Sequence, residues 1–132
     1  MFPLILALSV KGSFPMAMRD LTGAVDFAYL EDYTGGDVLI VEEVLRLFQQ
    51  QCELWSPLLT TTHEGWRDAA HTLKGAAAGI GANALSQVAG EAEHGDEEGA
   101  AGRLERVKTA LDAALYDVAA CLHGLQLRSL RG

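Results

Sequence analysis

The chain has 132 residues, of which 49% are hydrophobic and only three are proline, so it is long enough to bury one core and too apolar for a disordered segment. Its 18 acidic and 10 basic residues give a formal net charge of -8, which argues against nucleic acid as a partner because clustered Lys and Arg bind phosphate backbones. Ala, Leu, Glu and Val dominate and alternating β-branched residues are sparse, which predicts an all-α protein.

The first 18 residues are predicted to be an N-terminal extension, and residues 19–132 are predicted to form one helical domain. Residues 4–10 are apolar, but no basic segment precedes them, and about seven residues are too few to cross a bilayer. We therefore expect neither a signal peptide nor a membrane span. Two readings stay open: the extension packs loosely on the domain, or the natural protein begins at Met16 or Met18.

The first two helices are predicted on either side of a glycine turn. A short helix is expected over residues 25–32, before Gly35-Gly36. Asp37 is placed to cap the next helix, which should end at about residue 55 or 56 because Pro57 disfavours helical geometry in the residue before it.

This second helix carries two apolar lines. The first has a three-four spacing typical of a core stripe: Val38, Val41, Leu45, Phe48, Cys52 and Trp55. The second widens the apolar face: Ile40, Val44, Leu47 and Leu54. The second line is either partly exposed near His71 or covered by the first helix or residues 4–10, and both alternatives stay open.

Three further helices are expected: one over residues 64–78, one between Asn83 and Gly95, and one over residues 102–123. Gly79 and Gly81 are stop signals for the third helix, Asn83 is a candidate cap for the fourth, and Gly95 is placed to end it before a charged loop over residues 95–99. Four long amphipathic helices with short connections predict an antiparallel up-down four-helix bundle with an additional short N-terminal helix.

The predicted third helix has two distinct faces, because residues three and four apart lie on the same side. The face expected to be buried comprises Trp66, Ala70, Leu73, Ala77 and Ile80. The outward face comprises Arg67, His71, Lys74, Gly75 and Ala78. A histidine with a cation one turn before and after it suits an anion such as a phosphoryl group. Gly75 leaves clearance for a partner, and Gly79 extends this docking surface.

At these residues the chain resembles the histidine phosphotransfer (HPt) domain family. The similar segments are His71-Thr72-Leu73-Lys74-Gly75, Gly81-Ala82 with Leu85, and Gly35-Gly36-Asp37 with the helix up to Phe48. The resemblance covers roughly residues 25–123. It implies that His71 accepts a phosphoryl group and that Glu93, on the next helix, supports its imidazole.

The chemistry of the imidazole agrees with this resemblance. A carboxylate that accepts the Nδ1 proton leaves Nε2 free to attack phosphorus. Lys74 suits the neutralisation of phosphoryl oxygens as a point charge, and Arg67 could help. The non-functional alternatives are that Lys74 is simply a solvated surface residue and that Glu93 is one of several acidic residues near a loop.

The remaining reactive side chains are expected to be structural or solvated. Cys52 and Cys121 lie on apolar stripes, as small buried residues would, and fit a reducing cytoplasm. His63, His94 and His123 lie near predicted helix ends, and no histidine pair has the spacing of a helical metal site, so no metal is expected. No glycine loop follows a strand, so we expect neither ATP binding nor kinase activity.

These features predict a phosphorelay intermediate that passes a phosphoryl group between receiver-domain aspartates through phospho-His71. We expect receiver domains of response regulators, and a hybrid histidine kinase, as partners. The protein should need no cofactor of its own, with Mg²⁺ on the receiver. It should be a cytoplasmic monomer without membrane contact. The alternative is a non-catalytic helical adaptor that binds a partner through the apolar face of the second helix.

Overall fold

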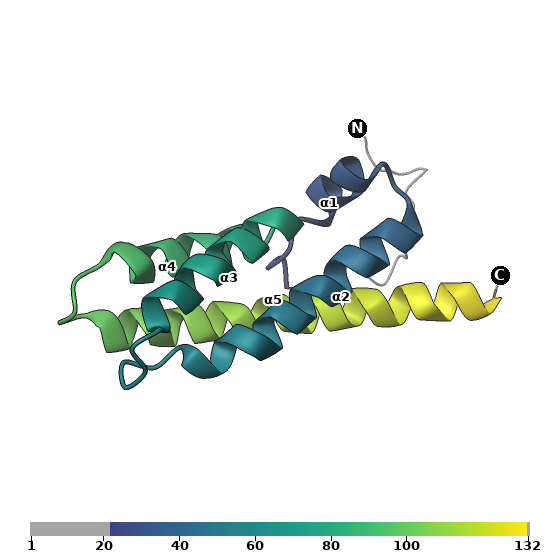
Figure 1. Ribbon diagram of the computed structural model, residues 1–132. Coiled ribbons are helices and arrows are strands. Elements are labelled where there is room, and N and C mark those ends of the chain that lie inside the picture. The colour runs from purple at the N-terminus through teal and green to yellow at the C-terminus, as the bar shows by residue number, and fades with distance from the viewer. Residues whose placement is uncertain (1–21, 132) are drawn as a thin grey trace.

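The computed structural model describes residues 22–131, which form five α-helices and no strand (Figure 1). The helices are α1 (Phe27–Thr34), α2 (Val38–Trp55), α3 (Trp66–Ile80), α4 (Asn83–His94) and α5 (Ala100–Arg131), with a short 3-10 helix η2 (Ser56–Leu58) after α2. Each of the four long helices packs against two others, and α1 packs against α2 and α3. The predicted all-α bundle with an additional short helix is confirmed, whereas the predicted extension over residues 1–18 lies outside the described residues.

The turn between α1 and α2 has the predicted chemistry. The Asp37 carboxylate accepts hydrogen bonds from the backbone N–H groups of Leu39 (3.0 Å) and Ile40 (3.4 Å), so it caps α2. Gly35 ends α1 in the left-handed conformation, with φ 67°. The predicted bounds of α1 were two residues too early at each end, because Asp26 is the N-cap rather than part of the helix.

The junction between α3 and α4 differs from the prediction. α3 continues past the predicted end at residue 78 to Ile80, and Gly81 is its C-cap, with φ 80°. A Cβ added at Gly81 would lie 3.0 Å from the Asp26 carbonyl oxygen. The predicted Asn83 cap is wrong, since Ala82 occupies the N-cap position and no side chain caps α4. Ala82 is fully buried and its N–H bonds to the Ala77 carbonyl, so this tight turn leaves no room for a polar cap.

α5 is longer than predicted, by two residues at its start and eight at its end (100–131 instead of 102–123). The early start buries Ala100 against the bundle, and the helix continues past His123 because Leu125 is still buried. The last turns then project beyond the other helices (Figure 1), and Leu130 is 79% exposed.

The predicted buried faces are confirmed. On α3, the residues Trp66, Ala70, Leu73, Ala77 and Ile80 are all buried. On α2, the residues Val41, Leu45, Phe48 and Cys52 are buried, and Val38 and Trp55 pack partly buried at its ends. Burial raises the pKa of the Cys52 and Cys121 thiols to about 12, as expected for inert core residues.

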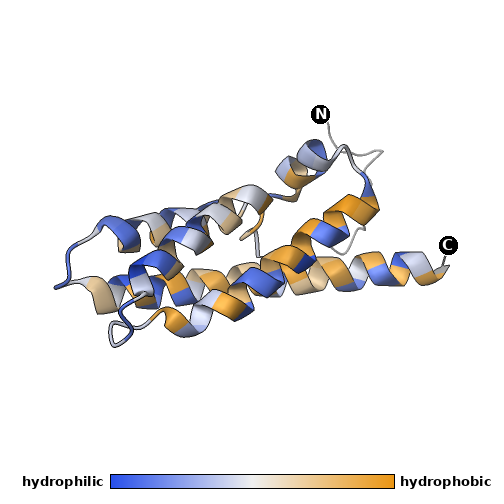
Figure 2. Cartoon of the chain, in the orientation of Figure 1, coloured by the Kyte–Doolittle hydropathy of each residue, from blue (hydrophilic) through white to orange (hydrophobic). Residues whose placement is uncertain are grey.

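The second apolar line of α2 stays largely exposed among the described residues. Ile40, Leu47 and Leu54 are exposed, whereas Val44 is partly buried. In Figure 2 much of α2 is coloured as hydrophobic, which includes both its buried and its exposed apolar lines. α1 therefore does not cover the line, and the alternative in which residues 4–10 cover it lies outside the described residues. None of the helices in residues 22–131 is both long and apolar enough to cross a membrane.

One buried acid ties the start of the domain to α5. The Asp117 carboxylate is fully buried and accepts hydrogen bonds from the Thr22 hydroxyl (2.9 Å), the Thr22 N–H (3.1 Å) and the Ala24 N–H (3.0 Å). These bonds satisfy the buried charge and fix the segment that leads into α1. Sequence patterning did not single out this residue.

Candidate functional site

His71 projects from the exposed face of α3, in the middle of the helix. Its side chain is 65% exposed, while its neighbours Ala70 and Leu73 are fully buried. The burial of the apolar face thus determines the rotation of α3 about its axis and turns the imidazole toward solvent. This exposure leaves the ring accessible to a partner protein.

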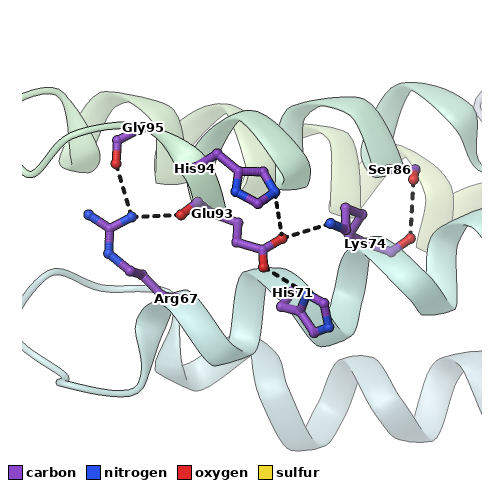
Figure 3. A network of polar contacts seen from close by, with 7 residues as sticks. All are labelled: Arg67, His71, Lys74, Ser86, Glu93, His94 and Gly95. Atoms are coloured by element: carbon purple, nitrogen blue, oxygen red, sulfur yellow. Dashed lines mark hydrogen bonds and ion pairs between the residues drawn. The ribbon is translucent and has the colours of Figure 1, made fainter.

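Glu93 reaches His71 and Lys74 from the last turn of α4, which packs along α3 (Figure 3). Its Oε2 lies 2.7 Å from Nδ1 of His71, and its Oε1 lies 2.8 Å from Nζ of Lys74. The Glu93 side chain is 17% exposed, so both contacts are partly shielded from water. His71 and Lys74 therefore both contact the Glu93 carboxylate, so the three residues predicted to form the centre of the site do lie together.

The electrostatics of the group determine its protonation. The hydrogen bond from the Lys74 ammonium, and then the contacts with His71, hold the pKa of Glu93 below its ordinary value of 4.5 against the opposing effect of desolvation. Glu93 is therefore ionised at neutral pH and acts as the acceptor, while Nδ1 of His71 donates. That tautomer leaves Nε2 with a free lone pair. The stabilisation from this carboxylate is complete above pH 4.5 and is lost as the pH falls through the lowered pKa.

Lys74 is positioned by α4 as well as by its own helix. The Ser86 hydroxyl donates to the Lys74 carbonyl oxygen (3.1 Å). A Cβ added at Gly90 would lie 3.3 Å from Cδ of Lys74, so the glycine gives the aliphatic part of the lysine room to cross α4. Sequence reasoning missed Gly90, although it lies three residues before Glu93 and hence on the same helix face.

Arg67 also lies on this face, but its guanidinium extends toward the end of α4 (Figure 3). Its Nη1 donates to the carbonyl oxygens of Glu93 (2.6 Å) and Gly95 (2.9 Å). Its Cζ lies 4.4 Å from the ring centroid of Trp66. The Arg67 guanidinium, which the sequence suggested for phosphoryl binding or docking, therefore contacts the backbone around Glu93.

The surface beside His71 is formed by small residues. Gly75, Ala78 and Gly79 are exposed on α3, as predicted. Gly75 and Gly79 line an open groove of about 270 Å³ between α2 and α3, opposite Leu47 of α2. A larger groove of about 430 Å³, between α2 and α5, contains none of the predicted site residues.

Of the other histidines, only His94 touches the site within the described residues. Its Nε2 lies 3.5 Å from Oε1 of Glu93, although the side chain is 71% exposed. His63 accepts a hydrogen bond from the Gly65 N–H (2.9 Å), and His123 is exposed on α5. Residues 22–131 contain no group of three His, Cys, Asp or Glu side chains arranged to hold a metal ion.

Comparison with known proteins agrees with this geometry. The family model of the Hpt domain matches residues 41–120, which include the whole of α3 and α4. The histidine phosphotransferase ShpA from Caulobacter crescentus is 55% identical over 82% of this chain and 99% of its own, with a TM-score of 0.73. No significant match was found among curated proteins. An exposed histidine paired with a carboxylate on a helical bundle, the family match and the similarity to a phosphotransferase together show that the chain belongs to the Hpt domain family, the phosphohistidine carriers of two-component phosphorelays.

Proposed function

We propose that His71 is the phosphohistidine of this carrier and that the phosphoryl group is bound to its Nε2. The observation that carries the assignment is the 2.7 Å contact between His71 Nδ1 and Glu93 Oε2. The carboxylate accepts the Nδ1 proton, so the exposed nitrogen is the nucleophile.

In the transfer step, the Nε2 lone pair attacks the phosphorus of an aspartyl phosphate on a receiver domain. The P–Nε2 bond forms as the P–O bond to the aspartate breaks, and the electron pair of that bond returns to the receiver carboxylate. The imidazole gains positive charge while it keeps its Nδ1 proton, and ionised Glu93 stabilises that charge. The reverse sequence passes the group to the next receiver.

The other proposed roles follow from charge and clearance. The Lys74 ammonium, 31% exposed, offsets negative charge on the phosphoryl oxygens as they approach. Mg²⁺ belongs to the receiver in this proposal, where it would stabilise the charge on the aspartyl phosphate. Arg67, proposed from the sequence as a docking residue, lies about two helical turns before Gly75, and its guanidinium contacts the backbone of Glu93 and Gly95.

The groove between α2 and α3 supports docking of a receiver at this surface. It lies beside Gly75, and the exposed Leu47 on its other wall offers apolar contact. The groove includes Val44 and Leu47 of the second apolar line of α2, whereas Ile40 and Leu54 lie outside it. No observation favours the adaptor alternative. We further propose a cytoplasmic monomer that receives its phosphoryl group from receivers, including that of a hybrid kinase, binds no nucleic acid and has no kinase activity of its own.

The assignment is tested by incubation with a phosphorylated receiver domain. The protein should acquire an acid-labile, base-stable phosphate, because a phosphoramidate bond hydrolyses in acid. A protein that stays unlabelled with receivers from its own genome, while ShpA is labelled by its receiver, would contradict the proposed role.

Glu93 provides a test of imidazole orientation. Glu93→Gln keeps one acceptor oxygen but turns an amide donor toward either Lys74 or His71, whereas Glu93→Ala removes both contacts. Transfer rates should therefore fall in the order wild type, Gln, Ala. In the Gln variant, the loss of the charge-assisted hydrogen bond should weaken the support of the imidazole by roughly 1 kcal/mol. Stopped-flow transfer from a phosphorylated receiver measures this order.

The control for Glu93 is Glu91→Ala, which removes a carboxylate of the same helix that contacts Gln87 and not His71. This variant should transfer at the wild-type rate. Equal rates for Glu93→Ala and wild type would show that another group orients His71.

Gly75 provides a test of docking that is separate from chemistry. A Cβ there would meet no described atom within 4 Å, so Gly75→Gln should fold and gain several tenths of a kcal/mol in helix propensity. The larger side chain should slow transfer from a receiver while His71 still reacts with the small donor phosphoramidate. Parallel assays with the two donors, and a thermal melt, check this result.

Gly102→Gln is the matched control, because Gly102 is an exposed helical glycine on α5 with the same open surroundings. It should leave both reactions unchanged. If Gly75→Gln slowed phosphorylation by the receiver and by phosphoramidate equally, the substitution would have distorted the site rather than blocked a partner.

A further inference from the structure

The carboxyl end of α4 depends on a side chain from α3. A helix leaves its last four carbonyl groups without helical partners. α4 ends at His94, and the following Gly95 has φ -78° and ψ 170°, so the chain leaves the helix in an extended conformation. The carbonyl oxygens of Glu93 and Gly95 instead accept hydrogen bonds from Nη1 of Arg67.

Arg67 is itself held in place by its neighbours. Its guanidinium lies over the indole of Trp66, 4.4 Å from the ring centroid, and this indole is buried in the core. A second contact, 3.8 Å from Nη2 to Oε2 of Glu97, is exposed and therefore weak. The stacked guanidinium is thus a fixed donor aimed at the α4 backbone.

Glu93 is consequently held at two places by one helix. Arg67 binds its backbone carbonyl, while His71 and Lys74 bind its carboxylate (Figure 3). The three residues follow one another at intervals of four and three along α3, so they form a single line on its surface. The distance from the α4 backbone to the imidazole is therefore set by α3 itself.

We propose that Arg67 is a positioning residue: it fixes the end of α4 so that Glu93 selects the Nδ1-protonated tautomer of His71. This inference rests on the proposed function of His71 and extends it to a residue that need not touch the phosphoryl group. In Figure 3 the guanidinium points toward Gly95, on the opposite side of the Glu93 carboxylate from Lys74.

The test replaces Arg67 with Met, which keeps an apolar side chain over Trp66 but donates no hydrogen bond, and with Lys, which retains a charged donor. Arg103→Met is the matched control, since Arg103 contacts the Asp96 carbonyl in the same loop and not Glu93. The ring ¹⁵N shifts of His71, recorded above neutral pH where an imidazole is uncharged, report the tautomer directly.

Arg67→Met should convert the single tautomer into a mixture. It should also slow phosphorylation by phosphoramidate and by a receiver alike, by about tenfold or more, because misplacing a reacting group by a substitution away from the chemistry costs up to about a hundredfold in rate. Arg67→Lys should restore part of the single-tautomer population and part of the phosphorylation rate. Arg103→Met should leave the tautomer unchanged even if it lowers the melting temperature.

Two results would overturn the inference. One is an Arg67→Met protein with an unchanged tautomer that loses only the receiver reaction, which would make Arg67 a docking contact. The other is an equal tautomer change in Arg103→Met, which would reduce the effect to general loosening of the loop. The tautomer is measured by NMR on the unphosphorylated protein, without any phosphoryl transfer. Failure of the wild-type protein to accept phosphate would therefore count against the proposed function and not against this inference.

Discussion

His71→Gln is expected to abolish phosphoryl acceptance while the protein stays folded. The imidazole is exposed, so its replacement should change the free energy of unfolding by only about 0.5 kcal/mol. Glutamine has no nucleophilic ring nitrogen, so transfer should be lost with a phosphorylated receiver and with phosphoramidate. Autoradiography of the labelled protein and a urea titration measure the two effects.

His123→Gln is the appropriate control, because His123 is an exposed histidine on α5 that lies outside the site. It should accept label at the wild-type rate. A His71→Gln protein that still acquires an acid-labile phosphate would remove His71 from the proposed mechanism.

Leu73→Ala should have the largest effect on stability. Leu73 is fully buried two residues after His71, on the opposite face of α3. Truncation removes the transfer free energy of the side chain and leaves a cavity, which together cost about 2 to 5 kcal/mol. The urea midpoint should fall accordingly, with little change in the slope of the transition.

Leu54→Ala is the matched control on α2, where the side chain is 64% exposed. Its free energy of unfolding should stay within about 0.5 kcal/mol of the wild-type value. If Leu73→Ala were as stable as Leu54→Ala, the two faces of α3 would be assigned the wrong way round, and His71 would point into the core.

Sequence reasoning predicted the features that depend on local periodicity. The three-four spacing on α3 separates Leu73 from His71, and that separation alone determines which side chain meets solvent. Asp37 was also predictable, because a capping carboxylate acts on backbone groups within a few residues. α4 does end before Gly95, but this glycine is extended rather than left-handed, so its position was predicted and its conformation was not.

Features that depend on contacts between helices were not predictable in this way. Arg67 looked like a cation for a phosphoryl group, since its spacing from His71 says nothing of the α4 carbonyl groups that it contacts. The Asn83 cap failed because the buried Ala82 sets the geometry of the turn. The end of α5 is a different case, because Leu125 lies three residues after Leu122, continues the apolar spacing and is buried, so the sequence did carry that signal.

The proposed mechanism requires Glu93 to hold the proton on Nδ1 and to leave Nε2 of His71 as the phosphorylated atom. It is tested most directly by two-dimensional ¹H–¹⁵N NMR of the ¹⁵N-histidine-labelled protein after phosphorylation by a receiver. We expect the ring ¹⁵N shifts of one histidine, His71, to change, with the phosphate on Nε2 and Nδ1 still protonated. A phosphate on Nδ1 of His71, or on His63, His94 or His123, would contradict it.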